Sequence, residues 1–190
     1  MNKISIIILA SGSSKRFNGN KLLYPINGKP MIEWSLINAT LLKKRLSIID
    51  EVVVVSKYDE ILKLTQNYNL KYINNFNSNE GITASIHLGV LHSKNHNDFM
   101  FMVGDEPYLR FETLLNFING FLKSNLPLGC LCDEDLNTSN PCIFSYDYKD
   151  DLLKLSSDRG GKTIILKNMD KVYLHKTPKN ELIDIDYLIK

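Results

Sequence analysis

The chain has 190 residues, 44% of them hydrophobic and 23% charged, and a formal net charge of +2. These values are typical of an ordinary globular protein, and the length favours a single domain over residues 1–190. A net charge this close to zero gives no general attraction to nucleic acid or to anionic lipid, so we expect neither nucleic acid nor a membrane as a partner.

The sequence carries few signals of targeting, membrane insertion or disulfide bonding. Its apolar runs are shorter than the roughly 20 residues of a membrane span. The apolar run near the N-terminus is β-branched and continues into a loop, which predicts a strand rather than a signal peptide, and we expect a cytoplasmic protein. Cys130, Cys132 and Cys142 lack the spacing of a disulfide framework or a metal site, so we expect them to fill space in late strands.

The first candidate site follows an apolar segment at residues 4–9, which predicts a central strand of a parallel sheet. Ligands of open α/β sheets bind beyond the carboxyl ends of such strands, and the small residues 10–14 allow backbone N–H groups to approach phosphate oxygens. Arg16 and Lys21 add a planar charged fork and a mobile point charge, which can neutralise oxygens on different phosphates of a triphosphate. The segment matches neither the P-loop nor the dinucleotide-binding glycine pattern, and a plain turn with solvated cations is the alternative.

The chain continues with alternating helix and strand patterns. Pro30 fits the first position of a helix whose apolar stripe would be Met31, Trp34, Ile37 and Leu41. Further elements are expected as a strand at 51–56, a helix at 59–68, a strand at 71–74 and a helix at 82–91. This order predicts an α/β fold, a three-layer α/β/α sandwich with a mainly parallel sheet and right-handed crossovers.

A polar loop at residues 75–81 precedes the helix at 82–91. Gly81 stands at the start of that helix, where backbone donors point outward and can contact an anion. A loop with an ordinary helix cap is the alternative, so the residues alone leave the role of this loop open.

A carboxylate follows the next predicted strand, at residues 99–103. Asp105 lies at the ligand-binding edge of the sheet, where a hard cation such as Mg²⁺ would take an oxygen ligand and share it with substrate phosphates. Pro107 fixes the turn and so keeps the side chain directed into the crevice. The alternative is that Asp105 only caps the next helix.

The second half of the chain predicts further elements after this turn. They are a helix at 111–122, a strand at 128–132, an acidic connection at 133–140, helices at 147–155 and 162–168, a strand at 172–175 and a short helix within 182–188. Gly160 and Gly161 open the helix at 162–168, whose N-terminus would hold an anion with Lys162 beside it. A plain turn between helices is the alternative.

Three motifs together resemble a known family. Residues 9–23, L-A-S-G-S-S-K-R-F-x-x-x-K-L-L, closely resemble the first loop of the nucleotidyltransferases that include the molybdenum cofactor cytidylyl- and guanylyltransferases. Residues 104–107 resemble the family's G-D-Q-P, with Glu106 in place of Gln, and residues 79–85 resemble its nucleotide-facing N-E-G-M-x-x-S segment. The resemblance implies a single MobA-like domain with a Rossmann-like nucleotidyltransferase fold. The nucleotide-binding residues that it implies are Leu9, Ala10, Ser11, Gly12, Arg16, Lys21, Gly81 and Ser85.

Two later segments resemble the cytidylyltransferase branch in particular. Residues 140–144 and 152–162 are similar to its G-[HN]-P-V-x-F and L-x-x-L-x-G-D-x-G-A-R patterns. Because the helix start at Gly160 and Gly161 lies far along the chain from the triphosphate loop, we expect Asp158, Gly160 and Lys162 to contact the acceptor and not the NTP.

The reaction that the resemblance implies is transfer of CMP from CTP to the phosphate of molybdopterin carrying molybdenum, with release of pyrophosphate. Arg16, Lys21 and Asp105 would be catalytic, because such a transfer needs positioning and charge neutralisation rather than a protein nucleophile. Asp105 and Asp186 would hold Mg²⁺, Asp184 would cap or point outward, and helix capping is the rival role for both later aspartates. We expect the NTP and a molybdopterin-type acceptor as small-molecule partners, and a molybdenum hydroxylase or its maturation factor as a protein partner.

The expectation of CTP rather than GTP depends on Ser11, at a position where the resembling family has Ala in cytidylyltransferases and Gly in guanylyltransferases. A side chain of this size would narrow the space beside the base and favour a pyrimidine, and its hydroxyl would donate to or accept from the base edge. Two alternatives remain open. One is a guanylyl- or other nucleotidyltransferase acting on a sugar or polyol phosphate, and the other is a non-catalytic nucleotide- or cofactor-binding accessory protein.

Overall fold

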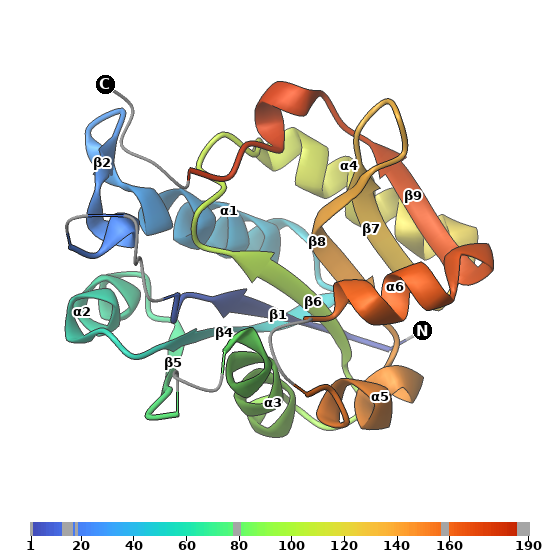
Figure 1. Ribbon diagram of the computed structural model, residues 1–190, viewed down its shortest axis with the longest axis horizontal. Coiled ribbons are helices and arrows are strands. Elements are labelled where there is room, and N and C mark those ends of the chain that lie inside the picture. Colours follow the sequence, from blue (N-terminus) through green and yellow to red (C-terminus); the bar gives the residue numbers. More distant parts are fainter. Residues whose placement is uncertain (1, 13–16, 18, 78–80, 157–159, 186–190) are drawn as a thin grey trace.

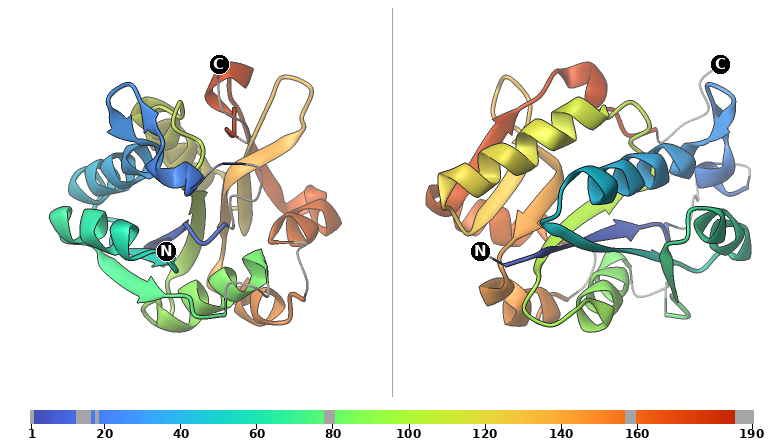
Figure 2. Two further views of the ribbon diagram at one scale, coloured as in Figure 1. Left: turned by 60° about the vertical axis from the view of Figure 1, so that its left-hand side comes forward. Right: turned by 180° about the vertical axis from the view of Figure 1, so that it is seen from behind.

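The computed structural model describes residues 2–12, 17, 19–77, 81–156 and 160–185. A seven-stranded sheet forms the middle layer, and helices cover both of its faces (Figure 1, Figure 2). Its strands are β1 (Ile4–Leu9), β4 (Ile49–Ser56), β5 (Lys71–Asn74), β6 (Asp98–Val103), β7 (Leu128–Cys132), β8 (Thr138–Phe144) and β9 (Val172–Lys176). Their spatial order is β5-β4-β1-β6-β8-β7-β9, and among them only β8 runs antiparallel to its neighbours. The predicted α/β/α sandwich with a mainly parallel sheet is therefore confirmed.

The remaining elements surround this sheet. The helices are α1 (Met31–Arg45), α2 (Asp59–Asn67), α3 (Ile82–His92), α4 (Phe111–Ser124), α5 (Lys149–Leu153) and α6 (Lys162–Lys167). Short 3₁₀ turns occur at η1 (Lys21–Leu23), η3 (Tyr146–Tyr148), η5 (Met169–Lys171) and η6 (Lys179–Glu181). A small second sheet pairs β2 (Pro25–Ile26) with β3 (Lys29–Pro30). Within the described part of the chain, each helix is too short or too polar to cross a bilayer.

Strand β1 lies at the centre of the core, as its apolar sequence predicts. Ile6 and Ile8 pack on one side of the sheet with residues of α1, α2 and α4. Ile7 packs on the other side with residues of α3, α5 and α6. Because successive side chains of a strand point to opposite faces, an unbroken apolar segment suits a strand that is covered twice. The three cysteines lie buried as free thiols in β7 and β8, which confirms that they fill space in late strands.

Helix α1 differs from its prediction in start and in buried face. It begins at Met31, because Pro30 belongs to β3 and precedes the helix in an extended conformation. The predicted stripe was wrong at Leu41, which is 42% exposed, whereas Ile32 and Leu36 are fully buried. Apolar residues occur on more than one side of this helix, so its sequence alone does not fix which side faces the sheet.

Three later predictions also need correction. The acidic connection is shorter than predicted, because Thr138 already belongs to β8 and pairs with Cys132 of β7. The predicted helix at 147–155 consists of η3 followed by the short α5. The predicted C-terminal helix is not formed by residues 182–185, where the backbone N–H of Ile185 instead donates to the carbonyl oxygen of Asp105 at 3.1 Å. The rest of that predicted helix lies outside the described residues.

Candidate active site

The carboxyl ends of β1 and β6 lie side by side and bring two predicted site loops together (Figure 1). Leu9 and Val103, the last residues of the two strands, are paired in register. The backbone N–H of Gly104 continues this pairing by donating to Leu9 O at 3.2 Å. On the other side of β1, Ala10 N–H donates to Val55 O at 2.9 Å. The loop that follows β1 and the loop that carries Asp105 therefore start from the same edge of the sheet.

Lys21 and Asp105 form an ion pair at this edge, with 2.8 Å between Lys21 Nζ and Asp105 Oδ2. The Asn20 side chain caps η1 by accepting from Leu22 N–H at 3.1 Å, and Leu22 is buried. A Cβ at Gly104 would lie 3.2 Å from Leu22 Cδ2, so the absence of a side chain allows η1 to approach this turn closely. The pair keeps 12% of the lysine side chain and 23% of the aspartate side chain exposed, so a ligand can reach both charges.

A cavity of about 310 Å³ is lined by two further acidic residues, Glu106, which follows Asp105 in the sequence, and Asp184. Glu106 is only 7% exposed. Burial raises the pKa of Glu106 to about 9, the negative charges of Asp105 and Asp184 add to the rise, and a hydrogen bond from Asn140 opposes it. The carboxyl is therefore protonated at neutral pH and offers one donor and one acceptor, as the amide of Gln does. This similarity accounts for Glu106 at a position where the resembling family has Gln.

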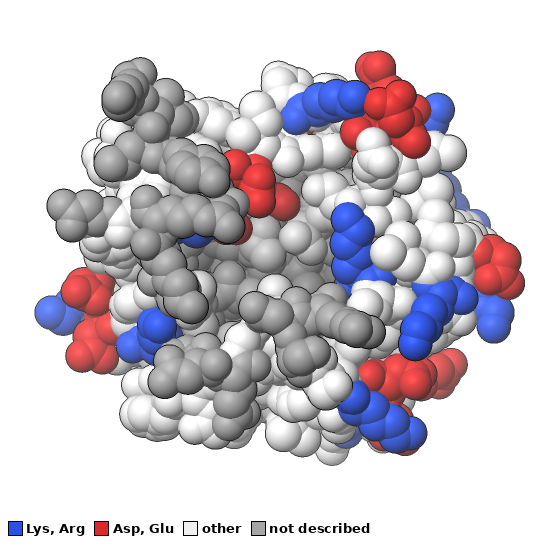
Figure 3. Space-filling model, in the orientation of Figure 1, with Lys and Arg blue, Asp and Glu red and all other residues white. Residues whose placement is uncertain are grey.

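Two of the predicted acceptor residues line the same cavity. Gly160 and Lys162 are brought together there with Glu106 and Asp184, and the Lys162 ammonium donates to Thr138 O at 3.2 Å. The cavity's further lining residues are Ile82, Thr138, Ser139, Asn140, Cys142, Gly161, Ile165 and Leu182. In the space-filling view this face is hollowed, with acidic side chains on one side of the hollow and basic side chains on the other (Figure 3). Asp158, the third predicted acceptor residue, lies outside the described residues.

The predicted nucleotide-binding serines are joined by a residue that the sequence analysis left without a role. Asn75, fully buried just beyond β5, donates to Ser85 Oγ at 2.9 Å and to Ser11 Oγ at 3.3 Å. The Ser11 hydroxyl donates to Val55 O at 3.3 Å. Gly81 immediately precedes α3 and has a positive φ of 82°, a conformation that favours glycine. The signal for Asn75 is its position after a strand at the ligand-binding edge of the sheet.

The donors at Asp105 suit a hard divalent cation. In the described part of the chain, no three acidic, histidine or cysteine side chains gather into a metal cage. Mg²⁺ keeps several waters and commonly binds through one or two carboxylates together with substrate phosphates, so a partly exposed carboxylate beside the predicted triphosphate loop fits it. Arg16 and Asp186 lie outside the described residues, and their roles remain predictions from the sequence.

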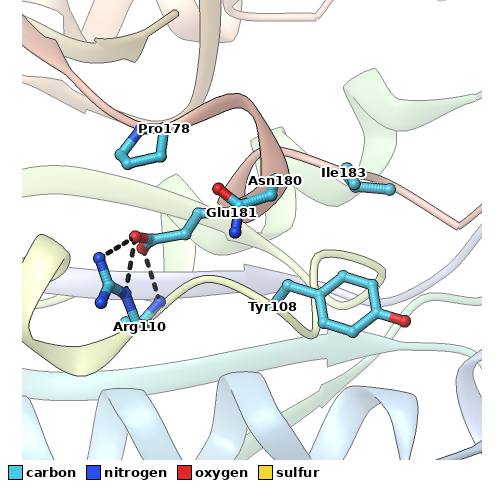
Figure 4. A pocket seen from close by; sticks show the side chains of 6 residues that line it. All are labelled: Tyr108, Arg110, Pro178, Asn180, Glu181 and Ile183. Carbon is cyan, nitrogen blue, oxygen red and sulfur yellow. Dashed lines mark hydrogen bonds and ion pairs between the residues drawn. The ribbon is translucent and has the colours of Figure 1, made fainter.

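The C-terminal segment is fixed beside the site by a buried carboxylate (Figure 4). Glu181 accepts hydrogen bonds from Arg110 N–H at 3.1 Å, from Arg110 Nε at 2.7 Å and from Thr113 Oγ1 at 2.7 Å. These contacts satisfy donors at the N-terminus of α4 and hold η6 against it. A hollow of about 690 Å³ lies alongside, lined in part by Tyr108 and Ile183. The segment that carries Asp184 is therefore held over the turn that carries Asp105.

Comparisons with known proteins agree with this geometry. The chain is 34% identical over 119 residues to a probable molybdenum cofactor guanylyltransferase of Thermococcus gammatolerans, a match covering 62% of this chain and 56% of the relative. It is 27% identical to a probable molybdenum cofactor guanylyltransferase of Peptoclostridium acidaminophilum, over 90% of this chain and 75% of that one. The chain thus spans little more than half the length of the first of these relatives.

Similarity of fold extends to solved structures. A nucleotidyl transferase from Methanothermobacter superposes with a TM-score of 0.79 at 20% identity, covering 98% of this chain and 93% of that one. The model of the MobA-like NTP transferase domain matches residues 6–172. This chain belongs to the MobA-like NTP transferase domain family.

Proposed function

We propose that this protein transfers a nucleoside monophosphate from an NTP to the phosphate of a molybdopterin-type acceptor and releases pyrophosphate. The observation that carries the proposal is the pairing of Lys21 with Asp105 at the carboxyl edge of a parallel sheet. Ligands bind at this edge in open α/β folds, and a triphosphate needs both a cation and a metal-binding carboxylate. The family to which the chain belongs, and the names of its relatives, support the same class of reaction.

The chain's own residues would act by positioning and by neutralising charge. Backbone N–H groups near Gly12 and the ammonium of Lys21 would bind the triphosphate, with Arg16 as a further cation predicted from the sequence. Asp105 would hold Mg²⁺, which supplies additional neutralisation of phosphate charge when it is bound. An oxygen of the acceptor phosphate would attack the α-phosphorus, and the bond from that phosphorus to the bridging oxygen would break, so pyrophosphate leaves. No protein nucleophile is needed for this exchange.

The cavity beside Glu106 is the proposed acceptor site. Its volume of about 310 Å³ lies at the lower end of the range for small-molecule pockets. Lys162 at its rim would approach an acceptor phosphate, and the protonated Glu106 would offer a donor and an acceptor to a heterocycle. A molybdenum hydroxylase, or the factor that matures it, is the protein partner that would receive the product.

We propose CTP as the nucleotide and GTP as the second candidate. The side chain at position 11 and the similarity of residues 140–162 to the cytidylyltransferase branch support CTP. The relatives named as probable guanylyltransferases support GTP. The inward hydrogen bond of Ser11 reduces the steric effect that was predicted from its size, because the hydroxyl is directed toward Val55 and Asn75.

The experiment is a matrix of four NTPs against several acceptors in the presence of Mg²⁺, read by pyrophosphate release and by the mass of the product. The acceptors are molybdopterin, a hexose 1-phosphate and a polyol phosphate. We expect pyrophosphate and a cytidylyl conjugate only with CTP and molybdopterin. A guanylyl conjugate would establish the second candidate, and a product only with the sugar or polyol phosphate would contradict the acceptor. Absence of any product from the folded protein would contradict the enzymatic function and leave the accessory role.

A further inference from the structure

Asn75 is fixed on every side within the protein. Its backbone N–H donates to Ser56 O at 2.8 Å, and its side-chain oxygen accepts from the backbone N–H of Asn77 at 3.1 Å. Its side-chain nitrogen donates to Ser85 Oγ and Ser11 Oγ. A buried amide whose donor and acceptor sides are both used has one orientation, so Asn75 presents its NH₂ group, and not its oxygen, to the two serines.

This orientation determines which hydrogen bonds Ser11 still has to offer. A serine hydroxyl has one donor and two acceptor lone pairs. The Ser11 proton is directed to Val55 O, and one lone pair receives the Asn75 NH₂. The remaining capacity of Ser11 is a single acceptor. Any base group that faces it must therefore be a donor, such as an exocyclic amino group, and a carbonyl oxygen in that place would meet a lone pair.

Asn75 also connects the two segments that flank the proposed base site. Ser11 belongs to the loop after β1. Ser85 lies in the first turn of α3, four residues after Gly81. Both serines are at least nine-tenths buried, with 9% and 2% of their surfaces exposed. The polar chain from Val55 through Ser11 and Asn75 to Ser85 is thus internal, and it holds the loop and the helix at a fixed separation.

We propose that Asn75 is the positioning residue for base selection, and that through Ser11 it makes the site select nucleotides whose base offers an amino group there. The inference rests on the proposed nucleotide site. The selection concerns nucleotides that cannot be distinguished by size. CTP and UTP have nearly the same shape, and at one ring position CTP carries an amino group where UTP carries an oxygen. GTP and ITP form a second pair, which differs by the presence of the 2-amino group.

The test is calorimetric measurement of nucleotide affinity with Mg²⁺ and without acceptor, so it does not depend on transfer. The parent should bind the amino-bearing member of its preferred pair at least roughly tenfold more tightly, the effect of about one hydrogen bond. Asn75→Ala removes the donor that occupies one lone pair of Ser11, so the hydroxyl can rotate away from Val55 O and donate to a carbonyl of the base instead. The preference should then fall to about threefold or less. Ser11→Ala should do the same, and Asn75→Ala should reduce the preference no further when Ser11 is already alanine.

Asn97→Ala is the matched control. Asn97 is a buried amide that donates to Ser5 Oγ at 3.0 Å, at the opposite end of β1 from the site. The Asn97→Ala variant should have a lower melting temperature than the parent, as Asn75→Ala should, but its preference between the two nucleotides of a pair should be unchanged. If Asn75→Ala does not fold, Ser11→Ala carries the test alone.

Equal binding of both members of each pair by the parent would overturn the inference, as would a preference that survives in Ser11→Ala. A parent that selects the amino-bearing nucleotide but releases no pyrophosphate with any acceptor would support the inference while contradicting the proposed transfer reaction.

Discussion

The backbone N–H of Ile185 donates a hydrogen bond to the carbonyl oxygen of Asp105 at 3.1 Å. The C-terminal segment therefore crosses the turn that follows β6, and Asp184 is held near Glu106 by the backbone itself. Ile185 is buried in a small cluster with Ile26 and Met31, which adds an apolar contact to this crossing. The geometry of the site thus depends on a segment far from it in the sequence.

Replacement of Glu181 should loosen this segment. In Glu181→Ala, the N–H of Arg110 and the hydroxyl of Thr113 lose their buried acceptor, and the free energy of unfolding should fall by about 1–3 kcal/mol. Urea denaturation measures the change. Glu112→Gln is the control, because it removes a charge from the same turn of α4 at an exposed position and should cost much less. Equal stabilities of parent and Glu181→Ala would contradict the role of Glu181 as an anchor.

The lowered pKa of Glu181 leads us to expect that its contribution to stability depends on pH. Burial alone would raise the pKa of Glu181, but hydrogen bonds from Arg110 and Thr113 outweigh it and hold the pKa below its ordinary value of 4.5. Since the folded state favours the ionised form, its contribution to stability is fully present above the unfolded-state pKa and is lost as the pH falls through the lower native pKa. The stability difference between parent and Glu181→Gln should therefore shrink as the pH is lowered from about 7 to 3. A difference that is constant across this range would count against the assigned charge interaction.

Much of the fold follows from local sequence patterns. β-Branched apolar runs such as residues 4–9 and 51–56 can be buried on both faces, and polar turns separate them from helices at regular intervals. Lys21 and Asp105 were both expected at the crevice because each follows a predicted parallel strand, and the structure places them 2.8 Å apart. A position after the carboxyl end of a parallel strand was thus sufficient to predict that both residues lie at one edge of the sheet, whereas the strand order that brings their loops together comes from the structure.

Contacts that depend on tertiary packing could not be predicted in this way. The pairing of Glu181 with Arg110 joins a polar tail to a helix start, and nothing local to either residue specifies the other. The sequence indicates only a turn residue at Asn75, and its hydrogen bonds to Ser11 and Ser85 form only in the folded structure. Residues 182–185 have a helix-compatible apolar pattern, but the structure has no helix there, and Ile185 N–H donates to the Asp105 carbonyl oxygen instead of to a carbonyl of its own segment.

Gly12 and Gly89 differ in the space around them, so substitutions at the two positions test a ligand-related and a structural role. Among the described residues, no atom lies within 4 Å of a Cβ built at Gly12, whereas a Cβ at Gly89 would lie 2.5 Å from Ile7 Cγ2. Gly12→Ala should therefore keep the parent's melting temperature but weaken NTP binding at least roughly tenfold, because the methyl group occupies space that phosphates approach. Gly89→Ala should instead destabilise the fold by about 1–3 kcal/mol. Unchanged NTP affinity in Gly12→Ala would place the triphosphate elsewhere.

Lys162 provides a test of the acceptor cavity. Lys162→Ala removes a positive charge from the rim and should raise the KM for the acceptor roughly tenfold while leaving the KM for the NTP unchanged. Lys167→Ala, at the other end of α6, is the control for a general loss of charge and should leave both constants unchanged. Steady-state kinetics with each substrate varied in turn distinguishes these cases. An equal rise in both KM values for Lys162→Ala would show that the cavity does not serve the acceptor alone.

The central claim is that Lys21 and Asp105 form the catalytic pair, and single-turnover release of pyrophosphate from the preferred NTP, with Mg²⁺ and saturating acceptor, tests it most directly. Asp105→Asn keeps the shape but weakens a hard-cation ligand, and Lys21→Ala removes a charge whose effect grows as the transition state forms. Lys29→Ala, a change to a more exposed lysine on β3, is the control and should react at the parent rate. With melting temperatures near that of the parent, Asp105→Asn and Lys21→Ala should each react at least roughly 100-fold more slowly. A rate close to the parent's in either folded variant would contradict the account.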